Sequence, residues 1–176
     1  MNVGTFALGK DDAFLSSATT YTWNGSVDGT WATANNWTPN GVPTAADNVI
    51  FNVVGTNPTN FNTTQTVNNL SLIGTGSLNL AASGNLTIAG NLTYVNTASA
   101  NFNCTSTLII SSAASQTIPA LNYGNLNLLG GPRVLSNTGT IGICGNYIAS
   151  AGVTTTTGST VNFNGIAAQS ILTSPA

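Results

Sequence analysis

The sequence predicts an all-β protein built as a parallel β-solenoid, and three observations lead to that prediction. Residues that favour helices are scarce, because the 176 residues include no Glu and a single Lys. Short runs that alternate apolar and small polar residues recur along the chain, bounded by Gly and Asn. Several short motifs also return at a nearly constant offset, as expected for stacked repeats.

The alternation is clearest between Asn69 and Tyr94. Four runs there place a small polar residue between two apolar ones: Leu70-Ser71-Leu72, Leu78-Asn79-Leu80, Leu86-Thr87-Ile88 and Leu92-Thr93-Tyr94. They are too short and too closely spaced for a sandwich, in which turns come about every 8–12 residues. They fit the flat faces and sharp corners of a solenoid. We expect one elongated core to contain Leu70, Leu78, Leu86, Leu92, Leu126 and Ile141.

A longer repeat supports the same fold. The tripeptides Gln65-Thr66-Val67, Gln116-Thr117-Ile118 and Gln169-Ser170-Ile171 lie 51 residues (116 − 65) and 53 residues (169 − 116) apart. Two further pairs keep similar offsets, 55 (139 − 84) and 53 (160 − 107): Gly84–Asn91 with Gly139–Asn146, and Thr107–Ile110 with Thr160–Phe163. We therefore predict solenoid repeats over residues 52–176, with a period of about 53 residues that holds two or three coils.

The near absence of charge agrees with stacking. Charged residues make up 3% of the chain, against roughly 25% in an average globular protein. In stacked coils, like side chains lie above one another, so like charges would repel whereas Asn and Thr can hydrogen-bond along the stack. Gly and Asn also tolerate the positive φ that sharp corners need.

The first 51 residues differ from the repeats. Residues 1–20 have no clean period and are expected to form a flexible N-terminal arm, whose apolar residues could add as a strand to a neighbouring copy. Residues 21–51 contain all three tryptophans, Trp23, Trp31 and Trp37, among Pro and Gly turns. An open solenoid end needs a cover, so this segment is predicted to be an aromatic cap. The alternative is a carbohydrate-binding module in which the three indoles stack on sugars.

The composition argues against several partners and locations. Two basic residues, Lys10 and Arg133, cannot form a groove for nucleic acid or a patch for anionic lipid. No apolar run approaches the roughly 20 residues of a membrane-spanning helix, so membrane insertion is not expected. The first residues lack the basic start and apolar stretch of a secretory signal, which in an exported protein would be removed or lie outside this sequence.

The sequence offers little chemistry, and we expect neither enzymatic activity nor a cofactor or metal. There is no His, and Lys10 is the sole candidate base for a hydroxyl nucleophile. Asp28 and Asp47 could form a carboxylate pair or bind calcium, but both lie in turn contexts where Asp normally caps the backbone. The run Thr154–Thr157 lacks the regular ladder of an ice-binding face. Cys104 and Cys144 are expected to be small buried hydrophobes, with a disulfide as the alternative.

Two blocks of sequence resemble a known group of proteins. Trp23-Asn24-Gly25, Trp31, Asn36-Trp37, Gly41-Val42-Pro43 and Asp47–Ile50 resemble the start of β-helical surface adhesins of gliding and other Bacteroidetes-type bacteria, and of autotransporter-like passengers. Asn162–Gly165 and Ala168–Ile171 resemble their internal repeats. The similarity covers roughly residues 21–171. It implies a right-handed parallel β-helix that is secreted to the cell surface.

The resemblance also implies a role. The expected function is that of a non-enzymatic adhesin or fibre-forming structural protein, a portion of a longer polypeptide. Its expected partners are other protein chains, through self-assembly or the secretion and surface apparatus, and surface glycans. Cell adhesion and gliding motility are the processes that such proteins serve.

Overall fold

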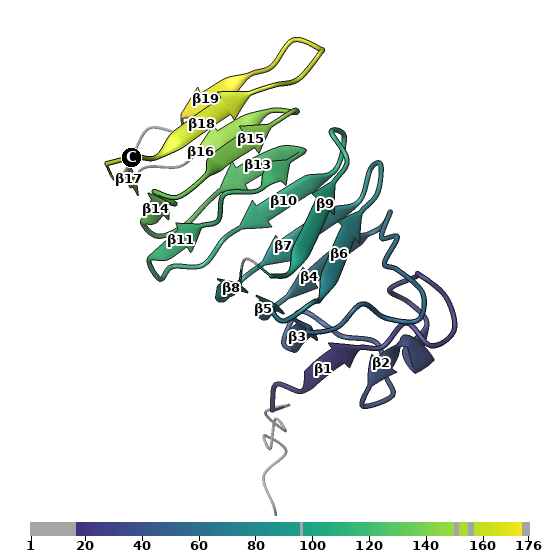
Figure 1. Cartoon of the computed structure of the whole chain (residues 1–176). Helices are drawn as coiled ribbons and strands as arrows, with labels where there is room; N and C mark the ends of the chain where they lie inside the picture. Colours follow the sequence, from purple (N-terminus) through teal and green to yellow (C-terminus); the bar gives the residue numbers. More distant parts are fainter. Residues whose placement is uncertain (1–16, 96, 150–151, 155–156, 174–176) are drawn as a thin grey trace, which may run out of the picture.

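Strands of two to four residues follow one another along the chain and stack into a solenoid of about six turns, with about 2% helix. The structure is a computed structural model that describes residues 17–95, 97–149, 152–154 and 157–173. Figure 1 shows the coils rising from the N-terminal end to the C-terminal end. The predicted all-β solenoid is confirmed, and the strands expected between Asn69 and Tyr94 are all present.

Each coil presents three faces. Face 1 contains β1 (Thr20–Trp23), β3 (Asn48–Phe51), β5 (Asn69–Leu72), β8 (Leu92–Tyr94), β11 (Gln116–Ile118), β14 (Arg133–Leu135) and β17 (Val153–Thr154). Face 2 contains β6 (Ser77–Leu80), β9 (Ser99–Phe102), β12 (Asn122–Tyr123), β15 (Thr140–Ile143) and β18 (Thr160–Phe163). Face 3 contains β4 (Thr64–Val67), β7 (Asn85–Ile88), β10 (Thr107–Ile110), β13 (Asn125–Leu128), β16 (Tyr147–Ala149) and β19 (Ile171–Thr173). Paired strands within a face run parallel, so equivalent residues of successive coils lie above one another.

The core runs along the axis of the stack. Alternate residues of most strands point inward and are buried, as in β5, β6, β7, β10 and β13. Five of the six residues expected in the core are buried: Leu70, Leu78, Leu86, Leu126 and Ile141. Leu92 is only partly buried. It packs against the core, so the expectation is met in part, and within the described residues its strand, β8, pairs with β5 alone.

Polar side chains hydrogen-bond along the stack, as the charge depletion predicted. At the corner before face 1, Asn69 donates from Nδ2 to Oδ1 of Asn48 at 2.7 Å, and accepts from the backbone N–H of Asn91 at 2.6 Å. At the corner before face 3, Asn125 accepts from the backbone N–H of Asn146 at 2.8 Å. These side chains satisfy one another and the backbone between coils without placing charge above charge.

The structural repeat is the single coil, and the offset of about 53 residues is not its period. Thr64, Asn85, Thr107 and Asn125 are successive partners on face 3, which gives steps of 21, 22 and 18 residues (85 − 64, 107 − 85, 125 − 107). Gln65 lies on face 3, whereas Gln116 lies on face 1. The similar tripeptides therefore occupy different faces, because 51 to 55 residues span a non-integral number of coils.

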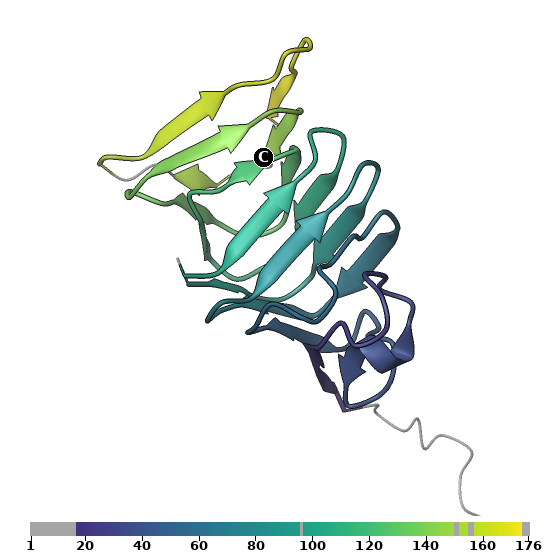
Figure 2. The same cartoon turned by 45° about the vertical axis from the view of Figure 1, so that its right-hand side comes forward.

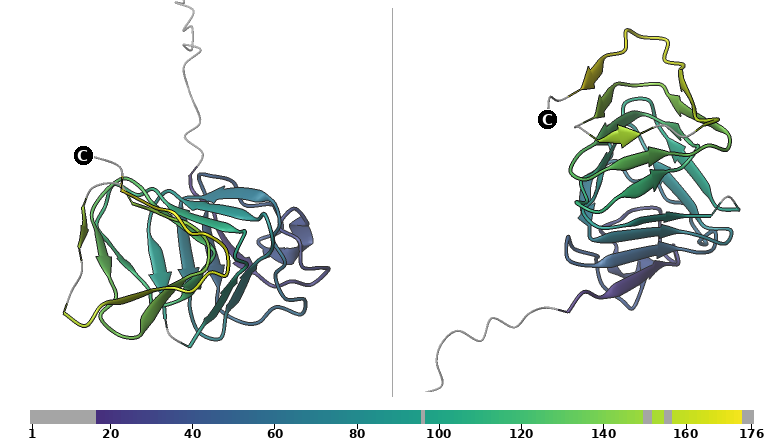
Figure 3. Two further views of the ribbon diagram at one scale, coloured as in Figure 1. Left: turned by 90° about the horizontal axis from the view of Figure 1, so that it is seen from above. Right: turned by 90° about the vertical axis from the view of Figure 1, so that its left-hand side faces the viewer.

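The cap closes the N-terminal end of the core. β2 (Trp37–Thr38) pairs antiparallel with β1, and the 3-10 helix η1 (Ala34–Asn36) precedes it. The boundary after residue 51 stays a prediction, and the structure shows that the cap is continuous with the first coils. β1 already pairs parallel with β3 as a rung of face 1, and Phe61 contributes its ring to the cap from beyond that boundary. Figure 3 shows the cap at one end of the stack.

The stack is interrupted between its third coil (β8, β9, β10) and its fourth (β11, β12, β13). Face 3 continues as one six-stranded sheet, whereas within the described residues face 1 divides between β8 and β11 and face 2 between β9 and β12. The connection from face 3 to face 1 is longest here, at residues 111–115, compared with residue 68 or residues 89–91 in earlier coils. The longer corner displaces β11 from β8. Figure 2 shows the coils diverging beyond β9.

Candidate functional site

The three tryptophans pack against one another at the capped end. Trp23, Trp31 and Trp37 are 1%, 2% and 1% exposed, which confirms the predicted aromatic cap. The ring centroids of Trp31 and Trp37 are 4.7 Å apart in an edge-to-face contact, and those of Trp23 and Trp37 are 4.9 Å apart. The Trp37 indole N–H donates to the Trp31 carbonyl at 2.9 Å. No indole face is left at the surface for a sugar to stack on, so the Trp23/Trp31/Trp37 platform is not supported.

Asp28 and Asp47 each cap a local turn. Asp28 accepts from the backbone N–H and hydroxyl of Thr30, both at 2.8 Å, and from Asn36 Nδ2 at 2.7 Å. These hydrogen bonds lower the pKa of Asp28 to about 2. Burial raises the pKa of Asp47, but hydrogen bonds from Thr44 and from the Thr19 backbone outweigh it and leave that pKa below its usual value.

The two carboxylates therefore hold the cap together, as the turn contexts predicted. Among the described residues no group of three or more His, Cys, Asp or Glu side chains is arranged to bind a metal ion. In the same part of the chain no helix is long and apolar enough to cross a membrane. Lys10 and half of the Thr154–Thr157 run lie outside the described residues.

Cys104 and Cys144 form a disulfide, so the expectation of two small buried hydrophobes is wrong. Cys104 follows β9 in the third coil and Cys144 follows β15 in the fifth, yet their Cα atoms are 5.2 Å apart. The fourth coil lies between them and turns this corner with Gly124 alone. A Cβ at Gly124 would lie 2.1 Å from the Asn103 carbonyl oxygen. This recessed corner allows the corners of the third and fifth coils to meet across it.

Arg133 is a buried cation at the corner between faces 3 and 1. It is 1% exposed, and its two terminal nitrogens donate to backbone carbonyl oxygens of six residues. The closest of those with ordinary distances are Gly131 and Ser112, both at 2.7 Å. A guanidinium carries a fork of N–H donors, and here it gathers carbonyl groups from two stacked corners. The sequence identified Arg133 only as one of two basic residues.

Two glutamines replace backbone pairing. Gln116 accepts the Leu92 N–H at 2.9 Å and donates to the Gly90 carbonyl, spanning the interruption on face 1. Gln169 accepts the Gly165 N–H at 3.0 Å and donates to the carbonyls of Ile143 and Gly145 at 2.7 and 2.6 Å. In two of its three copies, the repeated tripeptide thus carries a glutamine that bridges coils. The repeat itself was the one signal in the sequence for these bridging glutamines.

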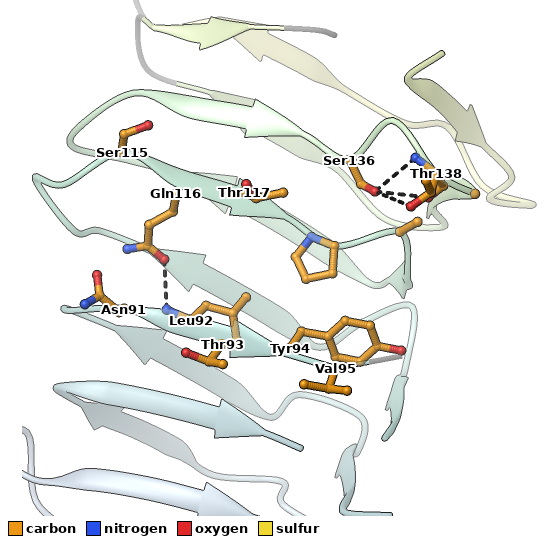
Figure 4. Close-up of a pocket in the computed structure, with 13 residues that line it drawn as sticks. Asn91, Leu92, Thr93, Tyr94, Val95, Ser115, Gln116, Thr117, Ser136 and Thr138 are labelled. Atoms are coloured by element: carbon orange, nitrogen blue, oxygen red, sulfur yellow. Dashed lines mark hydrogen bonds between the residues drawn. The ribbon is translucent and has the colours of Figure 1, made fainter. Parts of the chain in front are cut away.

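An open groove of about 990 Å³ lies where face 1 divides, and we call it the face 1 groove. β8 and the following Val95 form one side, β11 with Pro119 and Ala120 forms the other, and Ser136 and Thr138 lie at one end. Figure 4 shows Gln116 reaching across to Leu92 at the other end, where the dashed line marks its hydrogen bond. On face 2, the rings of Phe102 (β9) and Tyr123 (β12) stack across the same interruption with centroids 5.3 Å apart.

The C-terminal end of the core is not covered by the described residues. Val161 and Phe163 of β18 lie in register above the buried Ile141 and Ile143, and Ile171 of β19 lies above Tyr147. Phe163 is nevertheless 37% exposed and Ile171 is 57% exposed. Within the described residues, no further strand pairs with this last coil. The two ends of the solenoid therefore differ, one capped by tryptophans and the other presenting apolar side chains and strand edges.

The comparison with known families covers most of this arrangement. Residues 22–129 match the model of a family described as a domain of unknown function (DUF8693). The chain belongs to this family. The match to the DUF8693 model begins in β1, runs through the cap and ends just after β13, so it includes Cys104 but not Cys144. No curated protein and no solved structure matches the chain.

Proposed function

We propose that this protein is a non-enzymatic structural element of the bacterial cell surface. Its solenoid would serve as a stiff shaft or spacer in an exported adhesin or surface fibre. The observation that carries the proposal is the Cys104–Cys144 disulfide, which staples non-adjacent coils of a rod-shaped stack. Stable disulfides form in secreted, periplasmic and surface proteins and are rare in the reducing cytosol.

The stacking supports a mechanical role. In a solenoid each coil contacts its neighbours, so length is added by repetition and the sheets run along the whole stack. Face 3 provides one continuous six-stranded sheet, and the disulfide joins the coils on either side of the interruption. The hydrogen-bonded Asn rows supply polar contacts between coils without charge, which makes these contacts insensitive to ionic strength.

We further propose that another protein chain stacks on the C-terminal coil, as self-assembly or surface attachment would require. Unpaired strand edges recruit strands, and the exposed Phe163 and Ile171 supply the apolar surface for such a contact. The tryptophan cap closes the other end. Association of two copies through this coil would bring their like, C-terminal ends together.

Export is tested in the cells that make the protein. Thiols are trapped with an alkylating reagent in acid-quenched cells, and intact cells are labelled with an antibody against the folded protein. We expect Cys104 and Cys144 to resist alkylation without reduction, and the antibody to label cells that have not been permeabilised. Alkylated cysteines together with labelling only after permeabilisation would contradict the proposal.

Stacking is tested with the purified protein by sedimentation velocity over a range of concentrations. We expect concentration-dependent association that the double substitution Phe163→Asp/Ile171→Asp abolishes. Val54→Asp is the control, because Val54 is an apolar residue near the capped end that is 59% exposed, close to the 57% of Ile171. A native protein that remains a monomer at every concentration would contradict self-association.

A further inference from the structure

The face 1 groove carries an inference that goes beyond the shaft role. We propose that it binds a short, uncharged saccharide. The groove lies between the third and fourth coils, apart from the tryptophan cap, and is formed by residues that an unbroken solenoid would pair across face 1. The inference does not depend on export and concerns the folded protein alone.

The lining suits a neutral, hydroxyl-rich ligand. None of the 13 residues around the groove is charged. Thr93 and Thr117 offer hydroxyls from the two sides. Ser136 and Thr138 add two hydroxyls at one end, where Ser136 also donates to the Thr138 carbonyl at 3.0 Å. Hydroxyls both donate and accept, as do the hydroxyls of a sugar. A charged ligand would lose hydration here without gaining an opposite charge.

An aromatic ring and a proline supply the apolar part of the lining. The Tyr94 ring is half-buried, and its hydroxyl donates to the Ala98 carbonyl at 3.2 Å, which holds the ring in place. Pro119 lies on the opposite side of the groove. A pyranose presents C–H groups on its faces and hydroxyls around its rim, so a fixed phenol ring beside hydroxyl groups matches both. Figure 4 shows Tyr94 and Thr117 on opposite sides of the groove.

A peptide strand fits the groove less well, although two strand edges face it. Gln116 already bonds the Leu92 N–H and the Gly90 carbonyl at one end of the groove. Pro119 has no N–H to donate at the other end. β8 is three residues long, so an added strand would find few free backbone partners. The groove volume of about 990 Å³ lies near the upper end of the roughly 300–1,000 Å³ typical of small-ligand sites.

The experiment titrates the purified protein with neutral trisaccharides of glucose, galactose and mannose, by isothermal calorimetry and saturation-transfer NMR. We expect at least one to bind with a Kd between about 1 µM and 1 mM. Thr117→Trp places an indole into the groove from an exposed position and should weaken binding at least about tenfold. Thr64→Trp, an exposed strand position on face 3, is the matched control and should bind like the native protein.

Three results would overturn the proposal. The first is that the native protein binds none of the trisaccharides, while the circular dichroism of all three proteins shows the same fold. The second is that Thr117→Trp binds a trisaccharide as tightly as Thr64→Trp does, which would place the sugar elsewhere. The third is that an unstructured alternating Thr/Val peptide displaces the bound saccharide and binds more tightly, which would assign the groove to a strand.

Discussion

Cys104 and Cys144 are bonded to each other across a coil that contains neither of them. Their corners belong to the third and fifth coils, and the corner of the fourth coil recedes between them because Gly124 alone forms it. The disulfide therefore spans the fourth coil at the corner that follows face 2, beside the division of that face between β9 and β12. A covalent link replaces, on one edge of the stack, the strand pairing that is missing there.

Reduction should destabilise the protein substantially. The bond closes a loop with a sequence separation of 40, for which the chain-entropy relation gives about 4 kcal/mol. We expect the urea midpoint to fall in the presence of a reductant, and Cys104→Ser/Cys144→Ser to unfold at the same lowered midpoint. The double variant should not respond to the reductant. An unchanged native midpoint after verified reduction would rule out the stapling role.

The Gly124 corner can be tested separately. In Gly124→Ala, the new methyl group would approach the carbonyl oxygens of Asn103 and Ser106 to 2.1 and 2.5 Å, so the corners must move apart. We expect slower oxidative refolding and more free thiol by Ellman titration than in the native protein. Ser115→Ala, at an exposed corner position, should behave like the native protein. Equal thiol content in both variants would show that the recess is unnecessary.

Two tryptophans that are equally buried should tolerate Phe differently. Trp37 donates its N–H to the Trp31 carbonyl, whereas within the described residues the buried Trp23 N–H has no acceptor. Both substitutions lose packing, but Trp37→Phe also leaves the buried Trp31 carbonyl without its donor. The Trp37→Phe variant should therefore lose about 1–2 kcal/mol more unfolding free energy than Trp23→Phe in urea. Trp37→Ala should cost about 3–5 kcal/mol. Equal costs for the two Phe variants would contradict this reasoning.

Arg133 should be essential to its corner. Replacing it with Met keeps much of the side-chain length but leaves several buried carbonyl groups without their donor. We expect Arg133→Met to cost at least about 1–3 kcal/mol in urea unfolding, the cost of leaving a buried polar group unsatisfied. Arg133→Lys keeps the charge but not the planar fork, and should recover only part of the loss. A variant with Met as stable as the native protein would show that water replaces the guanidinium.

Acid should loosen the cap through Asp28. Its pKa is lower in the folded protein, about 2, than the usual value of 3.8, so the ionised form stabilises the fold. This contribution is complete above pH ~4 and is lost as the pH falls through about 2. The melting temperature of the native protein should therefore fall between pH 4 and pH 2 more steeply than that of Asp28→Asn. Asp47→Asn leaves Asp28 intact. The melting temperature of this variant should therefore still show the fall between pH 4 and pH 2 that Asp28 causes.

The sequence by itself determined the local features of the protein. Alternation places Leu70 and Leu78 in the core because side chains of a strand point to opposite sides. Scarce charge and abundant Asn predicted rows such as Asn48 and Asn69 because stacked coils bring like residues together. The three tryptophans predicted a cap because an exposed core end must be covered.

Only the tertiary structure decided which residues meet between coils. Each corner adds or removes a few residues, and these differences accumulate, so spacing in the sequence does not give the face on which a motif lies. For that reason the 51-residue offset placed Gln65 and Gln116 on different faces. The pairing of Cys104 with Cys144, the carbonyl cluster around Arg133 and the face 1 groove all depend on the lengths of the corners next to the interruption. The stacking of coils decides which residues about 20 positions apart come into contact. A local sequence pattern does not contain this information.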